Sequence, residues 1–135
     1  MIPLARRVGL SGIPELVVKM KGVGSDALTA DVVEAMTTNE TFFFRDKIPF
    51  DNFKDTVIPD LIKARASRRS LRIWCAASST GQEPYSLAML LKEMGSALTG
   101  WRVEIIATDL SQEVLEKSKS GMYSQFEVQR GLPIQ

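Results

Sequence analysis

Residues 71–95, LRIWCAASSTGQEPYSLAMLLKEMG, decide the fold because they pass from an apolar run to an amphipathic pattern across one short turn. The run 71–77 is almost continuously apolar, which is typical of a strand buried on both faces of a sheet. After the turn SSTGQEP, apolar residues recur at the spacing of one helical face. They are Leu87, Leu90, Leu91 and Met94. Gly95 is a favourable residue for the end of such a helix. The stretch therefore predicts a buried strand followed by a helix.

A second strand and helix follow directly. Residues 101–109, WRVEIIATD, predict a strand that ends at Asp109. Residues 111–121, SQEVLEKSKSG, predict a helix that Ser111 could cap and that Gly121 ends. Strand, helix, strand and helix in this order form a βαβ unit, so we expect an α/β fold with a parallel sheet.

Upstream of this unit the patterns predict helices. Residues 13–21 predict a helix with Pro14 in its first turn, and Thr29 is a candidate cap for a second helix. An apolar stripe between residues 50 and 62 is interrupted by Pro59, which predicts two short helices or one kinked helix.

Length and charge narrow the class of protein. The 135 residues suit one ordinary domain, and 17 Lys+Arg against 16 Asp+Glu leave a net charge of +1. This balance gives no general attraction to nucleic acid or to an anionic membrane. The densest basic run is interpreted as a solvated helix end: Lys63, Arg65, Arg68 and Arg69. We expect no membrane insertion and no secretory signal, and hence a cytoplasmic location.

The few reactive side chains exclude several chemistries. Histidine is absent, so Ser-His-Asp and Cys-His catalysis and His-ligated metals are excluded. One cysteine, Cys75, cannot form a disulfide framework or a Cys-based zinc cluster, and we expect no metal site. Mid-strand, Cys75 is expected to be a small core residue. Trp74 and Trp101 are likewise expected to pack in the core.

Two polar features fall at the carboxyl ends of the predicted strands, where open α/β sheets bind ligands. They are the turn SSTGQEPYS and Asp109. Gly81 would let the backbone approach a ligand, but the turn lacks the glycine pattern of a dinucleotide-binding or Walker loop. Glu83 would repel phosphates, so a positively charged nucleoside such as S-adenosylmethionine fits better, with Asp109 on its ribose.

Each of these features also has a structural interpretation. Thr80 and Glu83 have the spacing of a capping box, in which Glu83 would bond only to the helix start. Asp109 could be a turn residue or a cap for the next helix. Spacing alone does not separate these interpretations from the ligand site.

Residues 37–46, TTNETFFFRD, carry three adjacent aromatic rings that cannot all face one core. In a structural interpretation, Asn39 caps a turn, residues 42–44 hold helices together, and Arg45 pairs with a nearby acid. In a site interpretation, Arg45 positions a carboxylate and the rings exclude water. The motif by itself favours the structural interpretation.

Three stretches together closely resemble the CheR-type chemoreceptor glutamate methyltransferases. They are TTNETFFFRD, RIWCAASSTGQEPYSLAMLL and ATDLSQEVLEKSKSGMYSQFEVQRGLP. The resemblance implies a helical N-terminal segment followed by the first part of a Rossmann-like methyltransferase sheet, which is incomplete. Residues 1–46 would be the end of the N-terminal helical domain and a linker, and residues 47–135 the first part of the catalytic domain.

The same resemblance implies an activity and a set of residues. S-adenosylmethionine would be the methyl donor, with S-adenosylhomocysteine as product, and the substrate would be glutamate side chains in the cytoplasmic domain of a chemotaxis receptor. Thr41 and Arg45 would contact the cofactor or its surroundings, with Arg45 also in the catalytic role. Glu83 would bind the methionine end, Asp109 the ribose, and the turn Ala77 to Gly81 would pass under the methionine.

The resemblance also has departures and alternatives. The family usually has Glu at position 82, where this chain has Gln82. Because later parts of the family's site lie beyond residue 135, we expect the chain to be inactive alone and to self-associate through uncovered strands. A non-catalytic cofactor-binding regulatory module and a small-molecule carboxyl methyltransferase are the alternative functions.

Overall fold

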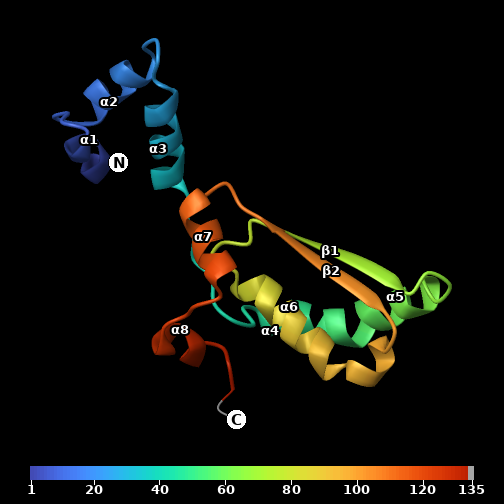
Figure 1. The fold of residues 1–135 in the computed structure, drawn as a ribbon. Coiled ribbons are helices and arrows are strands. Elements are labelled where there is room, and N and C mark those ends of the chain that lie inside the picture. Colours follow the sequence, from blue (N-terminus) through green and yellow to red (C-terminus); the bar gives the residue numbers. More distant parts are fainter. Residues whose placement is uncertain (134–135) are drawn as a thin grey trace. The chain divides into compact units, whose positions relative to one another are not determined.

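A computed structural model describes residues 1–133 and divides the chain into two compact units. The first unit contains Met1–Thr38 together with Leu110–Gln112, and the second contains the remainder. The first unit has three helices, α1 (Ile2–Arg7), α2 (Ile13–Met20) and α3 (Asp26–Met36) (Figure 1). Their shared core is small: Leu4, Ala5, Leu16 and Val32.

The helix starts in this unit follow the predictions in part. Pro14 occupies the first turn of α2, as predicted. The prediction that Thr29 caps the next helix is wrong, because α3 begins three residues earlier, at Asp26. The Thr29 N–H already donates to the Ser25 carbonyl at 2.8 Å, so Thr29 lies inside the helical hydrogen-bond pattern.

The second unit carries the remaining elements of the described chain. Three helical segments come first, namely α4 (Lys47–Asn52), a π-helical turn (Phe53–Val57) and α5 (Ile58–Ala64). β1 (Ser70–Ala76), α6 (Gln82–Glu93), a 3₁₀ turn (Gly95–Leu98) and β2 (Arg102–Thr108) follow. α7 (Gln112–Ser120) and the short α8 (Gln125–Gln129), which was not predicted, complete it.

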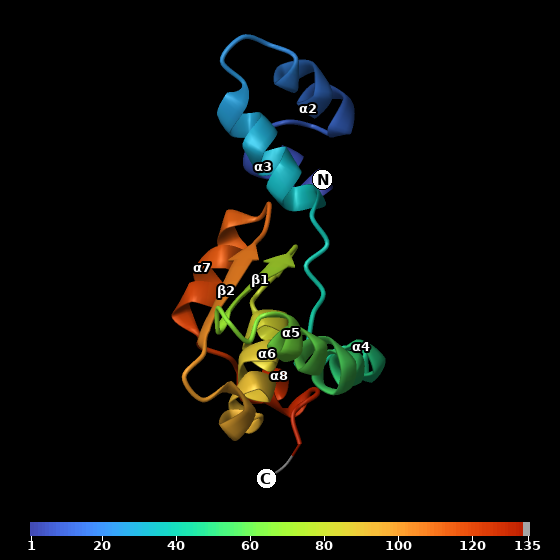
Figure 2. The same ribbon diagram turned by 90° about the vertical axis from the view of Figure 1, so that its right-hand side faces the viewer.

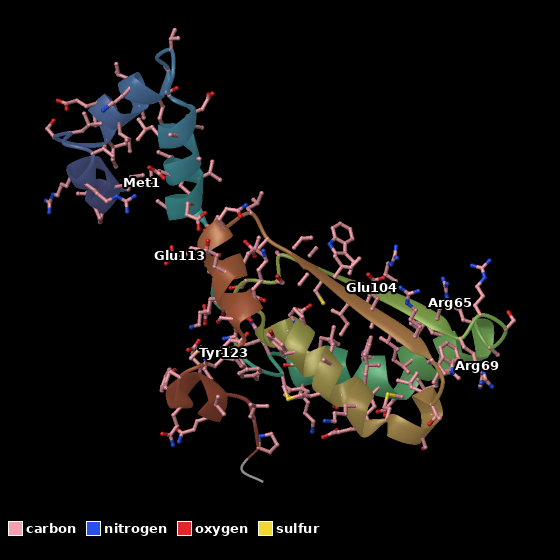
Figure 3. The ribbon with its side chains drawn as sticks, viewed as in Figure 1. Met1, Arg65, Arg69, Glu104, Glu113 and Tyr123 are labelled. Carbon is pink, nitrogen blue, oxygen red and sulfur yellow. The ribbon has the colours of Figure 1, made fainter. Side chains whose placement is uncertain are left out.

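The stripe around Pro59 forms α4, the π-helical turn and α5 in direct succession, with right-handed helical backbone at both junctions, so it is one helical segment with a π-helical interruption and not two separate helices. Pro59 lies in the first turn of α5, where a missing backbone N–H is tolerated. The π-helical turn before it absorbs the change in register. After α5 the basic run is exposed, as predicted, and Figure 3 shows Arg65 and Arg69 at this end of the sheet.

The sheet has two parallel strands among the described residues, which confirms the predicted βαβ unit. Ser70 pairs with Arg102 and Ala76 with Thr108, so both strands end at the same edge. Alternate residues of β1, Leu71 and Cys75, are buried against the three helical segments and α6. Figures 1 and 2 show α6 and the α4–α5 segment along the sheet. The core of this unit therefore lies on one face of the sheet.

The other face of the sheet is open, so the prediction of burial on both faces is wrong. Arg72 and Trp74 of β1 and Ile106 of β2 are exposed, and Trp74 is 71% accessible. Trp74 is therefore not a core residue; its indole N–H donates to Thr108 Oγ1 at 2.9 Å. Trp101 packs at the edge of the core as expected. The helices pack on one side of the sheet only, which leaves alternate residues of the apolar run uncovered.

Within residues 1–133, no helix is long and apolar enough to cross a bilayer. The same residues contain no group of three or more metal-ligating side chains placed to hold an ion.

Candidate functional site

The turn from Ala77 to Gly81 joins the end of β1 to the start of α6. Its backbone is left-handed at three alternate residues, Ala77 (φ 54°), Ser79 (φ 51°) and Gly81 (φ 97°). Non-glycine residues adopt this conformation only where the surroundings impose it. Ser78 Oγ is buried and has no hydrogen-bond partner among the described residues. The turn is therefore a strained segment that its neighbours hold in place.

Asp109 is one of those neighbours. Its carboxylate Oδ2 accepts a hydrogen bond from the Ser79 N–H at 2.8 Å, and the Ser78 N–H donates to the Thr108 carbonyl at 2.9 Å. The structure thus brings Asp109 beside the turn at the carboxyl edge of the sheet. It also gives the carboxylate a structural contact in addition to the predicted role on a ribose.

Gly81 is required by the chain itself. A Cβ at this position would overlap Ser118 Oγ and lie 2.9 Å from the Tyr123 hydroxyl oxygen, and the positive φ disfavours other residues. The side of Gly81 that lacks a Cβ is therefore packed against the segment from α7 to Tyr123. This packing explains the glycine without a ligand, and the predicted close approach of a ligand to its backbone stays a prediction.

Glu83 lies in the first turn of α6 but does not cap it. The N-cap is Gly81, and no side chain accepts a capping hydrogen bond there. The Thr80 hydroxyl instead donates to Gln82 Oε1 at 2.5 Å. The capping-box interpretation of Glu83 is therefore wrong. Within residues 1–133, its exposed carboxylate accepts no hydrogen bond and forms no ion pair.

The three adjacent phenylalanines point to three different partners. The ring of Phe42 lies 4.4 Å from the guanidinium carbon of Arg130. Phe43 is buried and meets Tyr123 edge to face at 5.1 Å, and Phe44 meets Phe50 of α4 in the same way at 5.3 Å. The expectation that they cannot share one core is confirmed, and they fasten the segment 39–46 to the second unit.

Two long-range hydrogen bonds place this segment beside the turn and α6. The Ser79 hydroxyl donates to the Asn39 carbonyl at 2.7 Å, and the Phe44 N–H donates to Ser86 Oγ at 2.9 Å. Ser86 is completely buried and donates onward to the Gln82 carbonyl at 2.6 Å. The segment is thus tied at both ends to the elements that carry Glu83.

Arg45 is the exposed residue that this arrangement presents. It lies between two residues with positive φ, Phe44 (φ 50°) and Asp46 (φ 59°). Its Nη1 donates to the Glu40 carbonyl at 2.8 Å. Because Arg45 has no ion pair among the described residues, the interpretation that it pairs with an acid is wrong.

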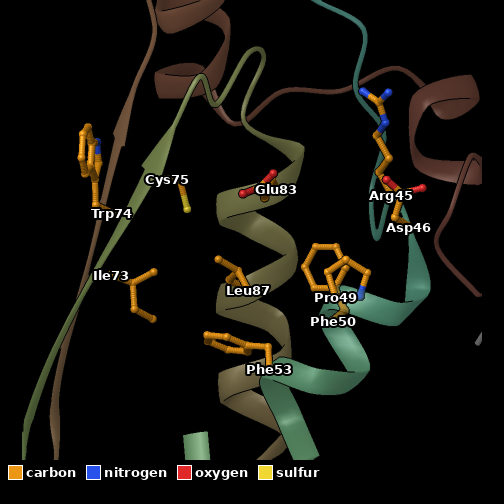
Figure 4. A pocket seen from close by; sticks show the side chains of 10 residues that line it. All are labelled: Arg45, Asp46, Pro49, Phe50, Phe53, Ile73, Trp74, Cys75, Glu83 and Leu87. Carbon is orange, nitrogen blue, oxygen red and sulfur yellow. The ribbon is translucent and has the colours of Figure 1, made fainter. Parts of the chain in front are cut away.

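Arg45 and Glu83 line one cavity of about 460 Å³. Figure 4 shows Glu83 on α6, Cys75 on β1, and Arg45 with Asp46 before α4. The other lining residues are largely apolar: Pro49, Phe50, Phe53, Ile73, Trp74 and Leu87. Burial, and then the negative charge of Glu83, raises the pKa of the Cys75 thiol. Cys75 therefore stays protonated and unreactive, as expected of a core residue.

The other predicted site residues lie outside the lining of this cavity. Thr41 is half-buried in the segment 39–46, and Ala77, Gly81 and Asp109 form the neighbouring turn and strand end. Sequence reasoning missed Ser86 and Tyr123, which connect the segment, the turn and α6. Neither has a distinctive spacing, because their contacts depend on residues more than forty positions away.

Comparison with known proteins gives one family. The family model described as CheR methyltransferase, SAM binding domain, matches residues 39–135. Chemotaxis protein methyltransferase 1 of Pseudomonas aeruginosa is 45% identical over 134 residues, which cover 96% of this chain and 47% of the relative. Chemotaxis protein methyltransferase Cher2 of Pseudomonas putida is 41% identical over 132 residues, or 96% of this chain and 48% of the relative.

A third relative, chemotaxis protein methyltransferase 1 of Vibrio cholerae, is 39% identical over 132 residues, which cover 96% of this chain and 47% of the relative. The chain spans about half the length of the curated relatives it matches. The family model covers the turn, both strands and the segment with Arg45. The chain therefore belongs to the CheR methyltransferase family and carries residues of its S-adenosylmethionine-binding domain.

Proposed function

We propose that this chain supplies part of the site for methyl transfer from S-adenosylmethionine to glutamate side chains of bacterial chemotaxis receptors. One observation carries the proposal. Glu83 and Arg45, from distant parts of the sequence, line one cavity beside the carboxyl end of β1. The names of the relatives, chemotaxis protein methyltransferases, support the same activity.

The residues present fit this cofactor. S-adenosylmethionine supplies a methyl group on a positively charged sulfonium, and its methionine end carries an ammonium and a carboxylate. Glu83 offers a carboxylate without a hydrogen-bond partner in the described chain, at the mouth of a cavity with apolar walls. An opposite charge is favoured there because apolar walls lower the local dielectric constant. We assign Glu83 to the methionine end of the cofactor.

The neighbouring residues have proposed roles of their own. Asp109 would accept hydrogen bonds from the ribose, and Ala77 to Gly81 would pass under the methionine. Thr41 and Arg45 would face the cofactor or its surroundings. The proximity of Asp109 to the turn, through the Ser79 N–H, supports a single continuous cradle.

Arg45 is assigned to orient a carboxylate. A glutamate substrate is already anionic at neutral pH, so the nucleophile requires no general base. The remaining task is to hold the carboxylate in line with the methyl group and to exclude water. Arg45 uses Nη1 on the Glu40 carbonyl, which leaves further N–H groups of its planar fork for a carboxylate. Phe50, Phe53 and Leu87 form the apolar wall.

Several wider assignments belong to the same proposal. The sheet is the first part of a Rossmann-like methyltransferase domain of residues 47–135, and residues 1–46 are the end of a helical domain with its linker. The segment 39–46 belongs to the second compact unit. The proposed domain boundary after residue 46 therefore separates two functional roles and does not coincide with the boundary between the compact units. The protein acts in the cytoplasm on the cytoplasmic domain of a receptor. The chain alone is inactive and self-associates.

The test uses a chimera in which this chain replaces the matching segment of the Pseudomonas aeruginosa relative, with radiolabelled S-adenosylmethionine. Base-labile label in receptor protein is the expected result, because glutamate methyl esters hydrolyse in base. Label in a soluble acid would instead support a small-molecule methyltransferase. Cofactor binding without any transfer would support a non-catalytic regulatory module.

A further inference from the structure

The last two residues of the turn and the first residue of α6 contact side chains from the chain after α7. The Tyr123 hydroxyl donates to the Thr80 carbonyl at 2.6 Å. Gly81 faces that same hydroxyl, and Gln82 Nε2 donates to Glu127 Oε2 at 3.4 Å. Figure 3 places Tyr123 after the end of α7, on the path to α8. The turn is therefore held by this part of the chain as well as by Asp109.

The ring of Tyr123 also reaches the segment that carries Arg45. It meets Phe43 edge to face, with centroids 5.1 Å apart and planes at 77°. On another side it meets Tyr85 of α6 at 5.9 Å and 81°. One side chain thus contacts the turn, α6 and the segment 39–46, the three pieces that bring Glu83 and Arg45 to one cavity.

The position of Tyr123 is itself held by contacts of residues that precede it in α7 and residues that follow it in α8. Lys117 of α7 forms an ion pair with Glu127 of α8 at 2.6 Å, and its Nζ lies 5.9 Å from the Tyr123 ring centroid. Ser124, the next residue, caps α8 in a reciprocal capping box with Glu127. Burial, then the negative charges of Tyr85 and Glu127 when ionised, raises the pKa of Tyr123 to about 12. The hydroxyl therefore remains a donor at physiological pH.

We propose that Tyr123 is a positioning residue for the cofactor site, whose hydroxyl fixes the turn before Glu83 and whose ring fixes the segment before Arg45. This role rests on the proposed function, but its effect on the turn exists without ligand. A left-handed, strained turn opens readily unless neighbours hold it. Because Tyr123 already orders the turn, a ligand would lose less binding free energy in ordering it.

The test compares Tyr123→Phe with Tyr85→Phe in the whole 135-residue chain. Both remove one hydroxyl and keep the ring, but the Tyr85 hydroxyl donates to the Ser118 carbonyl at 2.8 Å and does not contact the turn. Hydrogen exchange is measured at the amides of Gly81 and Tyr85, which donate to the Ser78 and Gly81 carbonyls. Affinity for S-adenosylhomocysteine is measured by calorimetry, and global stability by urea unfolding.

Tyr123→Phe should speed exchange at these two amides roughly fivefold, the effect of one lost neutral hydrogen bond, and weaken S-adenosylhomocysteine similarly. Tyr85→Phe should change neither, although both variants should have comparable global stability. Unchanged exchange in Tyr123→Phe, or the same local change in both variants, would overturn the role of Tyr123. If the parent chain binds no S-adenosylhomocysteine, the proposed cofactor site fails in this chain, and the exchange result still decides whether Tyr123 holds the turn.

Discussion

Glu83 and Arg45 are exposed, oppositely charged side chains at a cavity whose other walls are mostly apolar. Neither forms an ion pair within residues 1–133, with the other or with any third residue. Exposed ion pairs contribute little to stability, so their absence is not a defect of the fold. We propose that Glu83 recognises the ammonium at the methionine end of S-adenosylmethionine and that Arg45 orients a carboxylate, either the cofactor's or the substrate's.

Glu83→Gln tests this recognition with almost no change in shape. We expect affinity for S-adenosylhomocysteine to fall by about 1.5–3 kcal/mol, the value of hydrogen bonds to a charged group. Stability should fall by less than about 1 kcal/mol, since only the favourable charge near the helix start is removed. Calorimetry and urea unfolding measure the two quantities. A loss of stability with unchanged affinity for S-adenosylhomocysteine would show that Glu83 has a structural role and does not bind the cofactor.

Arg45→Ala should reduce methyl transfer by the chimera while the fold persists, because Arg45 is exposed and its side-chain bond is to one carbonyl. Arg45→Lys should recover part of the rate, since it keeps the charge and loses the planar fork. The rates of incorporation of labelled methyl into receptor protein measure both effects. An alanine variant as active as its parent would remove Arg45 from the site.

At the scale of elements, α6 shows what sequence patterns can predict. Its buried face was predictable because apolar residues at period 3.6 arise from burial of one helical face, and both strands were predictable because short apolar runs bounded by turns are typical of strands. The open face of the sheet was not predictable from the sequence. Trp74 is an apolar residue of the kind found in cores, and its exposure depends on which face of the sheet the helices cover. The proposals for Arg45 and Asp109 rest on the family resemblance and, for Asp109, on its place at a strand end. Tyr123 was missed because its partner, the Thr80 carbonyl, has no sequence pattern.

The start of α8 should depend on acid pH. The ion pair with Lys117, then the backbone hydrogen bond from Ser124, lowers the pKa of Glu127. Since the folded pKa lies below the unfolded one, this stabilisation is present above the usual glutamate range and is lost as pH falls through the folded pKa. The protection of the amides of residues 125–129, taken relative to the intrinsic exchange rate at each pH, should therefore fall on acidification below about pH 4. Glu127→Gln should show fast exchange already at neutral pH; a parent-like acid response in that variant would contradict the assignment.

At the scale of the molecule, the open face of the sheet is an exposed apolar feature with a predicted consequence. Trp74 and Ile106 are 71% and 38% accessible on adjacent parallel strands. We expect concentration-dependent self-association in sedimentation experiments, because burial of such a face is favourable. Trp74→Ser should suppress it, whereas Met122→Ser, which removes a 76% accessible residue outside the sheet, should not. A parent chain that stays monomeric at high concentration would contradict this expectation.

The most direct test of the cofactor site is an NMR titration of the 135-residue chain with S-adenosylhomocysteine. We expect saturable shifts of the amides of residues 77–83 and Asp109, with smaller shifts in the segment 39–46. Asp109→Asn, which can still accept the Ser79 N–H but loses its charge, should weaken binding while the turn stays folded. A folded chain whose spectrum is unchanged at saturating ligand, or whose shifts fall outside these segments, would contradict it.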